Sequence, residues 1–192
     1  MLIGITGGIG GGKTTLSGLL KNKGYLVFDT DASARDLQNG DAKIQSEIIQ
    51  LFGKESYNGN TLNRKFVANI VFENPTQLSK LNAIIHPAVK DEIAKWTIKH
   101  QHEKMLFIEC AILFEGSFDK LVDKTILVTA ELQTRINRIM LRDNMTREQA
   151  LNRINSQMPD EEKMKLVDYT IRTDDNTPLD VKIEKVLSMI IT

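Results

Sequence analysis

The chain has a single cysteine, Cys110, among its 192 residues. One cysteine cannot form a disulfide within the chain, and its scarcity suits a reducing compartment. The three histidines, His86, His100 and His102, have no zinc-ligand spacing with that cysteine. The sequence therefore excludes a disulfide-stabilised fold and gives no sign of a zinc site.

Net charge is also absent, because 25 basic and 25 acidic residues cancel. Without an excess of one sign, no global field attracts nucleic acid or an anionic membrane. No apolar run approaches the length that spans a bilayer, and the N-terminus shows no signal-peptide pattern. We therefore expect a cytoplasmic protein that binds neither nucleic acid nor membranes. The sequence does not give its oligomeric state, and we expect a monomer or small homo-oligomer.

Five short apolar segments have the composition of buried strands, and helical patterns separate them. No repeat or low-complexity tract interrupts this order. The expected strands span residues 2–6, 25–28, 105–108, 125–128 and 169–171. Such alternation predicts an α/β fold, in which helices cover both faces of a parallel sheet.

Residues 7–14 read Gly-Gly-Ile-Gly-Gly-Gly-Lys-Thr and match the phosphate-binding P-loop, G-x-x-x-x-G-K-[ST]. The loop follows an expected strand and precedes a helical segment, as the motif requires. Glycines let backbone N–H groups approach phosphate oxygens, and the helix N-terminus adds unpaired N–H groups. Lys13 would neutralise the terminal phosphates, and the Thr14 hydroxyl would bind Mg²⁺. The expected ATP contacts of this segment are Gly8, Gly10, Gly11, Gly12, Lys13, Thr14 and Thr15.

Acidic residues follow two of the other expected strands, at the edge where parallel sheets bind ligands. Asp29 and Asp31 follow the second strand, and Glu109 follows the third. A kinase needs a carboxylate that deprotonates the acceptor hydroxyl, and Asp31 is our candidate, although it could equally be a helix N-cap. Glu109 could hold a Mg²⁺-bound water or a substrate hydroxyl, or be a structural ion-pair partner. The sequence leaves open which acid contacts the metal.

Two helical regions extend the predicted nucleotide-binding core, which comprises residues 1–40, 104–130 and 166–192 of a single P-loop kinase unit. Residues 41–103 follow helical spacing, and we interpret them as an insertion that holds the acceptor substrate. Packing or a partner surface would give the same pattern. Residues 131–165 are predicted to form a helical lid.

The predicted lid carries Arg135, Arg138 and Arg142, which are spaced to share one helical face. Such a face suits a lid that closes on a triphosphate and excludes water. The alternative is a solvated basic surface on which Glu131 pairs with Arg135. Spacing does not choose between these interpretations, whereas the P-loop favours the lid.

Local patterns also mark helix boundaries. Asn74-Pro75 predicts a helix start with proline in the first turn. Residues 146–149 have the sequence of a capping box, so a helix should begin there. His86 precedes Pro87, which fits a helix boundary, because the residue before proline disfavours helical geometry.

In combination, these segments resemble the dephospho-coenzyme A kinase family over nearly the whole chain. The P-loop alone is shared by many proteins, whereas the ordered set is much narrower. The matching segments are Thr6 to Gly10, Asp29-Thr30-Asp31 with Ala34-Arg35, Leu62-Asn63-Arg64, Ile70-Val71-Phe72, residues 81–87 ending in His86-Pro87, Leu113-Phe114-Glu115, Arg138 to Asp143, and Gln157-Met158-Pro159.

The resemblance implies a P-loop NTPase fold and ATP-dependent phosphorylation of the ribose 3′-hydroxyl of dephospho-coenzyme A, with Mg²⁺ as cofactor. This is the last step of coenzyme A biosynthesis. In this analogy Asp31 is the general base, and Lys13 and Arg138 neutralise the transferring phosphoryl group. The further implied contacts are Arg138 and Arg142 with ATP, and Asp31, Arg35, Arg64, His86 and Glu109 with the acceptor.

The chain departs from the family pattern at four positions. Gly11 stands where serine is usual, and Glu109 replaces the commoner aspartate. Ala111 occupies a position that is often proline, and Thr173 lies where the family generally shows an asparagine. The departure near Thr173 lies in the loop that the family resemblance implies would contact adenine.

Two other functions are compatible with a P-loop. Another small-molecule kinase, such as one acting on a nucleoside monophosphate, would use the same loop, lid and acids. A GTP-hydrolysing switch protein is disfavoured, because the N-K-x-D and D-x-x-G segments of such proteins are absent.

Overall fold

The computed structural model describes residues 1–72 and 74–191. Contacts divide the chain into two compact units. The first unit comprises residues 1–28 together with the chain from residue 100 onward, and the second unit comprises Asp29–Lys99. The second unit therefore begins earlier than residue 41, where the helical insertion was expected to start. Among the described residues, no helix is long and apolar enough to cross a membrane.

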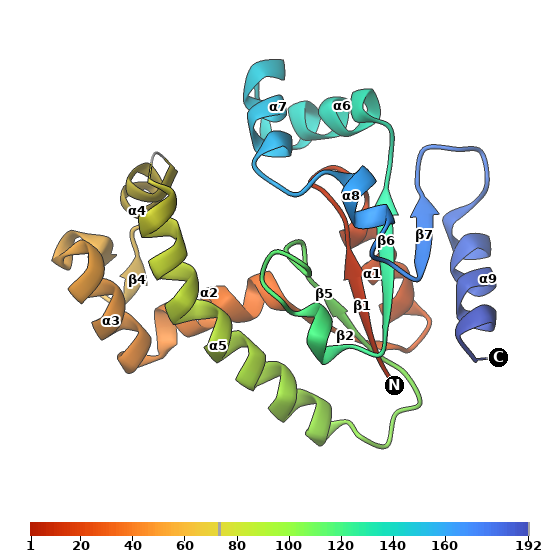
Figure 1. Ribbon diagram of the computed structural model, residues 1–192, viewed down its shortest axis with the longest axis horizontal. Helices are drawn as coiled ribbons and strands as arrows, with labels where there is room; N and C mark the ends of the chain where they lie inside the picture. The colour runs from red at the N-terminus through yellow and green to blue at the C-terminus, as the bar shows by residue number, and fades with distance from the viewer. Residues whose placement is uncertain (73, 192) are drawn as a thin grey trace. The chain divides into compact units, whose positions relative to one another are not determined.

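The first unit is built on a five-stranded sheet (Figure 1). The strand order is β2-β5-β1-β6-β7. The central strand β1 runs parallel to β5 and β6, and β6 runs parallel to β7. The strands are β1 (Leu2–Thr6), β2 (Leu26–Asp29), β5 (Leu106–Glu109), β6 (Lys124–Thr129) and β7 (Tyr169–Arg172). Each of the five predicted segments forms a strand, so the predicted α/β fold is confirmed.

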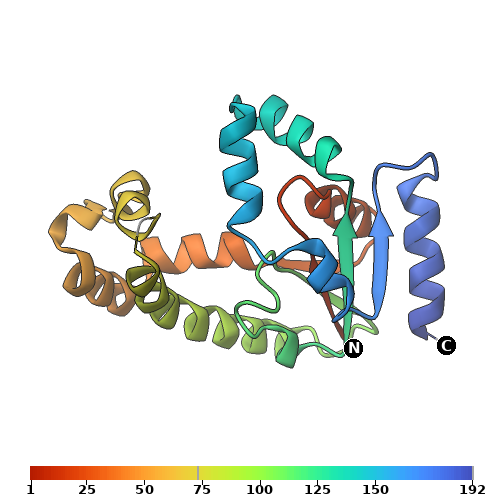
Figure 2. The same ribbon diagram turned by 45° about the horizontal axis from the view of Figure 1, so that its top comes forward.

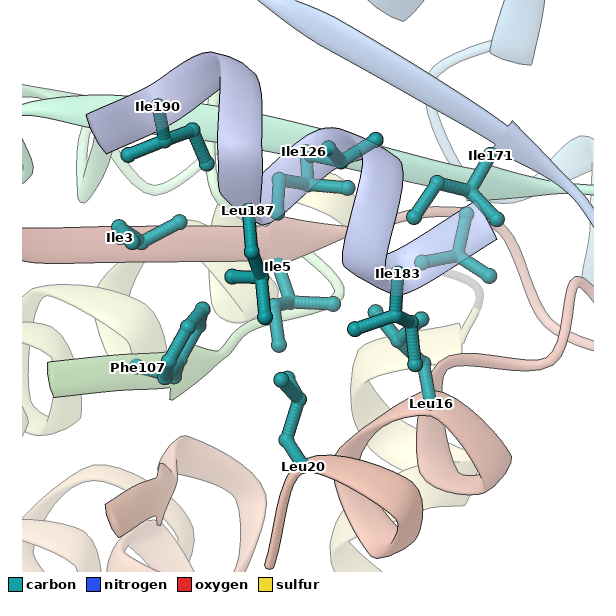
Figure 3. Packing of buried hydrophobic residues seen from close by; sticks show 12 residues of the cluster. Ile3, Ile5, Leu16, Leu20, Phe107, Ile126, Ile171, Ile183, Leu187 and Ile190 are labelled. Atoms are coloured by element: carbon teal, nitrogen blue, oxygen red, sulfur yellow. The ribbon is translucent and has the colours of Figure 1, made fainter. Parts of the chain in front are cut away.

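Helices α1 (Lys13–Asn22) and α9 (Leu179–Ile191) pack on one face of this sheet. Ile3 and Ile5 of β1 point into this core, together with Leu16 of α1 and Leu187 of α9 (Figure 3). All five residues of β1 are buried. A strand that is buried on both faces has no alternation of polar side chains, which explains its continuous apolar sequence.

Beyond the carboxyl end of β6, α6 (Leu132–Asp143) and α7 (Arg147–Asn155) form a hairpin (Figures 1 and 2). The predicted capping box at the start of α7 is confirmed, because the Thr146 and Gln149 side chains each accept from the other residue's backbone N–H. The short helix α8 (Asp160–Met164) follows and packs against β6. A 3₁₀ turn, η2 (Asp119–Leu121), precedes β6.

The second unit is helical apart from a small hairpin. Its long helix α5 packs against the other three helices of the unit. The predicted start of α5 is confirmed, and the Asn74 side chain accepts from the backbone N–H of Gln77 at 3.1 Å. The elements are α2 (Thr30–Gly40), α3 (Ala42–Phe52), η1 (Lys54–Ser56), β3 (Tyr57–Asn58), β4 (Thr61–Leu62), α4 (Arg64–Phe72) and α5 (Pro75–Lys99).

The predicted helix boundary at His86-Pro87 is wrong, because α5 continues through Pro87. Proline removes one helical hydrogen bond and crowds the preceding turn. On either side of Pro87, however, Ile85 and Val89 are buried in the second unit. The packing of α5 therefore outweighs the tendency of proline to interrupt a helix. This packing involves residues distant in the sequence, so the residues next to Pro87 do not reveal it.

Candidate active site

The P-loop has the geometry of an anion-binding turn. Gly12 precedes α1 with a φ of 104°, in the left-handed region that favours glycine. A Cβ at Gly12 would also lie 2.9 Å from the Thr173 methyl group. No side chain caps α1, so the amides of its first turn can face a phosphate. The structure thus brings Gly8 to Thr15 together as the motif predicts, while their contacts with ATP remain predictions.

Lys13 lies over the loop that precedes it. Its ammonium donates to the Gly7 carbonyl at 2.7 Å. The Gly8 carbonyl lies 3.4 Å away on the same side. This position holds a positive charge beside the loop amides, where the terminal phosphates of a nucleotide would be bound.

Thr14 and Glu109 meet at the carboxyl edge of the sheet. The Thr14 hydroxyl donates to a Glu109 carboxylate oxygen at 3.1 Å. Their approach follows from the parallel register, which places Glu109 of β5 opposite Ile5 of β1, just before the P-loop. A hydroxyl and a carboxylate are the hard oxygen ligands that Mg²⁺ prefers. The residues present therefore fit a magnesium ion.

A magnesium ion at this edge would need further ligands. Within residues 1–72 and 74–191, no group of three or more His, Cys, Asp or Glu side chains is arranged to hold a metal. Mg²⁺ usually keeps several waters and binds substrate phosphates besides one or two protein oxygens. The pair formed by Thr14 and Glu109 suits that mode of binding.

The three arginines of α6 differ in exposure, although Arg135 and Arg138 both donate to carbonyls of the P-loop. Arg135 is buried and pairs with Asp160, with 3.0 Å between the charged atoms. Arg138 is half-buried and Arg142 is exposed. The alternative pairing of Glu131 with Arg135 is wrong, because the Glu131 carboxylate contacts Arg172. The helix faces protein at Arg135, which spacing alone does not reveal.

Arg138 joins the P-loop to the segment that follows β7. Its guanidinium donates to the Gly10 carbonyl at 3.1 Å and to the Thr173 hydroxyl at 2.7 Å. It also donates to the Thr173 carbonyl at 2.9 Å. The charge is thereby fixed beside the loop, as expected of a group that neutralises a transferring phosphoryl group.

Arg142 lies one turn further along α6 and forms a two-pronged contact with Asp143. The two bonds measure 2.8 and 2.9 Å. The hydrogen bond from Arg142 to Asp143 lowers the pKa of the Asp143 carboxyl. The predicted contact of Arg142 with ATP remains a prediction.

In the second unit, the N-cap of α2 is Asp29 and not Asp31. The Asp29 carboxylate accepts from the backbone N–H of Ala32 at 2.9 Å. Asp31 lies exposed in the first helical turn. The capping role considered for Asp31 is therefore already filled, and its carboxylate faces outward. Arg35 is exposed one turn later on α2, and residues four apart lie on the same side of a helix.

Arg64 and His86 are carried by the other helices of the second unit. Arg64 is the exposed first residue of α4. His86 is half-buried within α5. Burial, with a smaller contribution from the charge of Lys90, lowers the pKa of His86. Their binding of an acceptor remains a prediction.

Three side chains near the candidate site, Gln157, Asp160 and Lys163, received no role from the sequence. The Asp160 carboxylate and the Gln157 amide oxygen accept from the backbone N–H groups of Gly8 and Ile9. Lys163 is fully buried and donates to the Ala111 carbonyl at 2.9 Å, close in sequence to Glu109. The motif Gln157-Met158-Pro159 marked this region without indicating what it contacts.

The family model for dephospho-CoA kinase matches residues 1–178. The chain belongs to the dephospho-CoA kinase family. The dephospho-CoA kinase of Fusobacterium nucleatum is 40% identical over 178 residues, which cover 92% of this chain and 91% of that protein. The dephospho-CoA kinase of Bacteroides fragilis is 38% identical over 177 residues, covering 92% and 86% of the two chains. The resemblance seen in the sequence is thereby confirmed.

Solved structures agree with this assignment. TT1252 from Thermus thermophilus has a TM-score of 0.88 at 33% identity, covering 100% of this chain and 98% of that one. The dephospho-CoA kinase of Campylobacter jejuni has a TM-score of 0.72 at 26% identity, with 98% and 96% covered. A shikimate kinase from Acinetobacter baumannii, at 17% identity and a TM-score of 0.56, shares the fold alone. The protein is a P-loop kinase, and the alternatives of a nucleoside monophosphate kinase or a switch protein are not favoured.

Proposed function

We propose that this protein transfers the γ-phosphoryl group of ATP to the ribose 3′-hydroxyl of dephospho-coenzyme A, giving coenzyme A and ADP. The observation that carries the proposal is the family match over residues 1–178, together with a complete P-loop at the carboxyl edge of the sheet. Both substrates are small molecules. The cytoplasm is the proposed location, because a single cysteine suits a reducing compartment.

The nucleotide side of the reaction depends on fixed positive charge. Phosphoryl transfer spreads negative charge over the oxygens of the moving group, so catalysis consists mainly of positioning and electrostatic stabilisation. Lys13 and Arg138 are both held at P-loop carbonyls, at Gly7 and Gly10. Each would neutralise charge on the phosphates without moving far.

The acceptor side requires a base. Asp31 would accept the proton of the 3′-hydroxyl while that oxygen bonds to the γ-phosphorus and the bond to the ADP oxygen breaks. Its exposed carboxylate is available for this role, because Asp29 caps the helix. Arg35, Arg64 and His86 would bind the acceptor, which carries phosphate groups that arginine recognises well.

Mg²⁺ is the proposed cofactor, held by Thr14 with help from Glu109. When bound, such an ion neutralises charge on the nucleotide phosphates. The Glu109 carboxylate would orient the Thr14 hydroxyl, or a water next to it. Glu109 was also a candidate for contact with the acceptor hydroxyl, and removing its carboxylate while varying Mg²⁺ and acceptor in turn would separate the two roles.

The proposed reaction is tested by mixing purified protein with Mg-ATP and dephospho-coenzyme A. ADP should be released, and mass spectrometry should show coenzyme A carrying one added phosphoryl group. Omitting dephospho-coenzyme A is the control for simple ATP hydrolysis. Turnover with AMP or another alcohol, but none with dephospho-coenzyme A, would refute the acceptor assignment.

A further inference from the structure

The first half of the P-loop is held by side chains that are far away in the sequence. The Gly8 N–H donates to the Asp160 carboxylate at 3.2 Å, and the Ile9 N–H donates to the Gln157 amide oxygen at 2.8 Å. The Ile9 carbonyl accepts from Nε of Arg135 at 3.0 Å. Three backbone groups of Gly8 and Ile9 are therefore fixed by side chains from the α6–α8 region.

These contacts centre on a buried ion pair. The Arg135 and Asp160 side chains are 8% and 5% exposed, and their charged atoms are 3.0 Å apart. The hydroxyl of Thr129 donates to the same Asp160 oxygen. A buried pair is rarely a net source of stability, because desolvation offsets the attraction. What this pair provides is a fixed geometry for the backbone groups that it touches.

The loop is also fitted to this pair by shape. A Cβ at Gly8 would lie 2.0 Å from a terminal nitrogen of Arg135, so the guanidinium packs directly on the loop backbone. The Ile9 side chain packs against the cluster formed by Ile136, Ile139 and their neighbours in the α6–α7 hairpin. The glycine at position 8 is therefore required by Arg135, independently of any phosphate.

We propose that Arg135 and Asp160 are positioning residues that hold the P-loop in its nucleotide-binding conformation. Neither contacts a reacting atom in this proposal. Both act through the backbone of Gly8 and Ile9, upstream of the amides that face the phosphates. A loop that is ordered before ATP arrives pays less conformational entropy on binding, which raises affinity. The proposal rests on the nucleotide-binding part of the proposed function and is independent of the acceptor.

Because Arg135 and Asp160 carry opposite charges, their removal should affect the binding of an anionic nucleotide to different extents. Together they add no net charge beside the phosphates. Replacing Arg135 by methionine leaves a carboxylate near a bound anion, whereas Asp160→Asn leaves a guanidinium there. Both changes loosen the loop, but only the first adds electrostatic repulsion. ATP binding should therefore be weakened more by Arg135→Met than by Asp160→Asn.

The experiment measures ADP and ATP binding by calorimetry on the full chain, together with KM for each substrate, kcat and thermal unfolding. The variants are Arg135→Met, Arg135→Lys and Asp160→Asn. Glu161→Gln is the matched control, because this exposed side chain lies next to Asp160 on α8. Calorimetry of nucleotide binding requires no acceptor, so this result does not depend on which acceptor the enzyme uses.

We expect Asp160→Asn to weaken nucleotide binding roughly tenfold, as for loss of a hydrogen bond to a charged group, and Arg135→Met to weaken it further. Arg135→Lys keeps the charge but lacks the second donor that reaches Ile9, so it should fall between wild type and Arg135→Met. In these variants KM for ATP should rise in parallel, while KM for the acceptor should not change. The Glu161→Gln protein should bind nucleotide with wild-type affinity.

The double variant Arg135→Met with Asp160→Leu separates positioning from stability. Apolar side chains of similar size often replace a buried ion pair with little loss of stability. This protein should therefore unfold near the wild-type temperature and still bind nucleotide roughly tenfold more weakly. Wild-type nucleotide affinity in the folded double variant, or a fall in kcat with unchanged KM for ATP in the single variants, would overturn the proposal.

Discussion

Around the P-loop, the charged side chains of the first unit are tied to protein partners, whereas those expected to bind the acceptor in the second unit are mostly exposed. Lys13, Arg135 and Arg138 each hold a backbone carbonyl of the loop. Asp31 and Arg64 lie on exposed helix surfaces. The nucleotide part is thus organised by the protein alone, while the acceptor part has side chains that are open to a ligand.

This difference suggests a division of labour. A site that must stabilise charge in a transition state benefits from groups that need no rearrangement. A site that recognises a large flexible substrate can use side chains that become ordered on binding, at some cost in affinity. Variants in the first unit should therefore affect ATP binding and chemistry together. Variants in the second unit should affect either acceptor binding or chemistry and leave ATP binding unchanged.

The largest effect is expected for Lys13→Ala. Removing the ammonium beside Gly7 deletes both a phosphate contact and transition-state stabilisation, so kcat/KM for ATP should fall about 10⁴-fold. Steady-state kinetics with varied ATP measures this loss. Lys21→Ala is the control, because it removes an exposed lysine of the same helix α1. A loss below tenfold would show that Lys13 is not part of the phosphate site.

Asp31→Asn should come next and should separate chemistry from binding. Loss of a general base lowers kcat by about 10³-fold, and the nucleotide affinity should not change because Asp31 is proposed to contact the acceptor hydroxyl and not ATP. Single-turnover kinetics and ADP calorimetry provide the two measurements. Asp36→Asn removes another exposed acid of α2 and should leave both unchanged. A wild-type turnover rate in Asp31→Asn would contradict the base assignment.

Arg64→Ala sharpens the comparison between the two units. Loss of a charge-assisted contact should raise KM for dephospho-coenzyme A about tenfold and leave KM for ATP unchanged. Arg138→Ala should show the reverse preference, because Arg138 is held at the P-loop. Lys65→Ala, at the neighbouring exposed position of α4, is the matched control. If Arg64→Ala instead raised KM for ATP, the acceptor role of Arg64 would be wrong.

The smallest effect concerns stability and pH. Burial lowers the pKa of His86 below its usual 6.5, so between that value and the lowered pKa the unfolded chain binds more protons than the folded one. Stability should therefore fall as pH drops below about 6.5. Urea unfolding of the full chain over this range measures the slope. His86→Gln should flatten it, and Lys90→Gln should flatten it partly, because Lys90 contributes to the lowered pKa.

Much of the fold followed from the sequence. Each predicted strand formed, because short apolar runs that alternate with helical segments are typical of strands buried in a covered parallel sheet. The P-loop, the Asn74-Pro75 helix start and the capping box at Thr146 were also confirmed, since each depends on residues that are close in the chain. Such patterns can be predicted from the sequence because the interactions that form them involve neighbouring residues.

Other outcomes could not be derived from a single local pattern. Two of the three arginines at helical spacing contact the P-loop, but the spacing did not indicate that Arg135 is also buried against Asp160. Asp31 was considered as a cap, but Asp29 performs that role. Pro87 was expected to end a helix that continues through it. In the first and third cases the deciding contacts come from segments outside the pattern, and in the second two neighbouring acids competed for one position.

The sequence by itself determined that this chain has a P-loop between a strand and a helix and belongs to a family of kinases, because both conclusions depend on ordered local motifs. Only the tertiary structure decided how that loop is held. Gly8 and Asp160 are brought together when β6, α6 and α8 pack around the P-loop. The two residues are 152 positions apart, and no local sequence pattern predicts a contact between them. The physical reason is that burial converts charges that look like surface groups into fixed partners of the backbone.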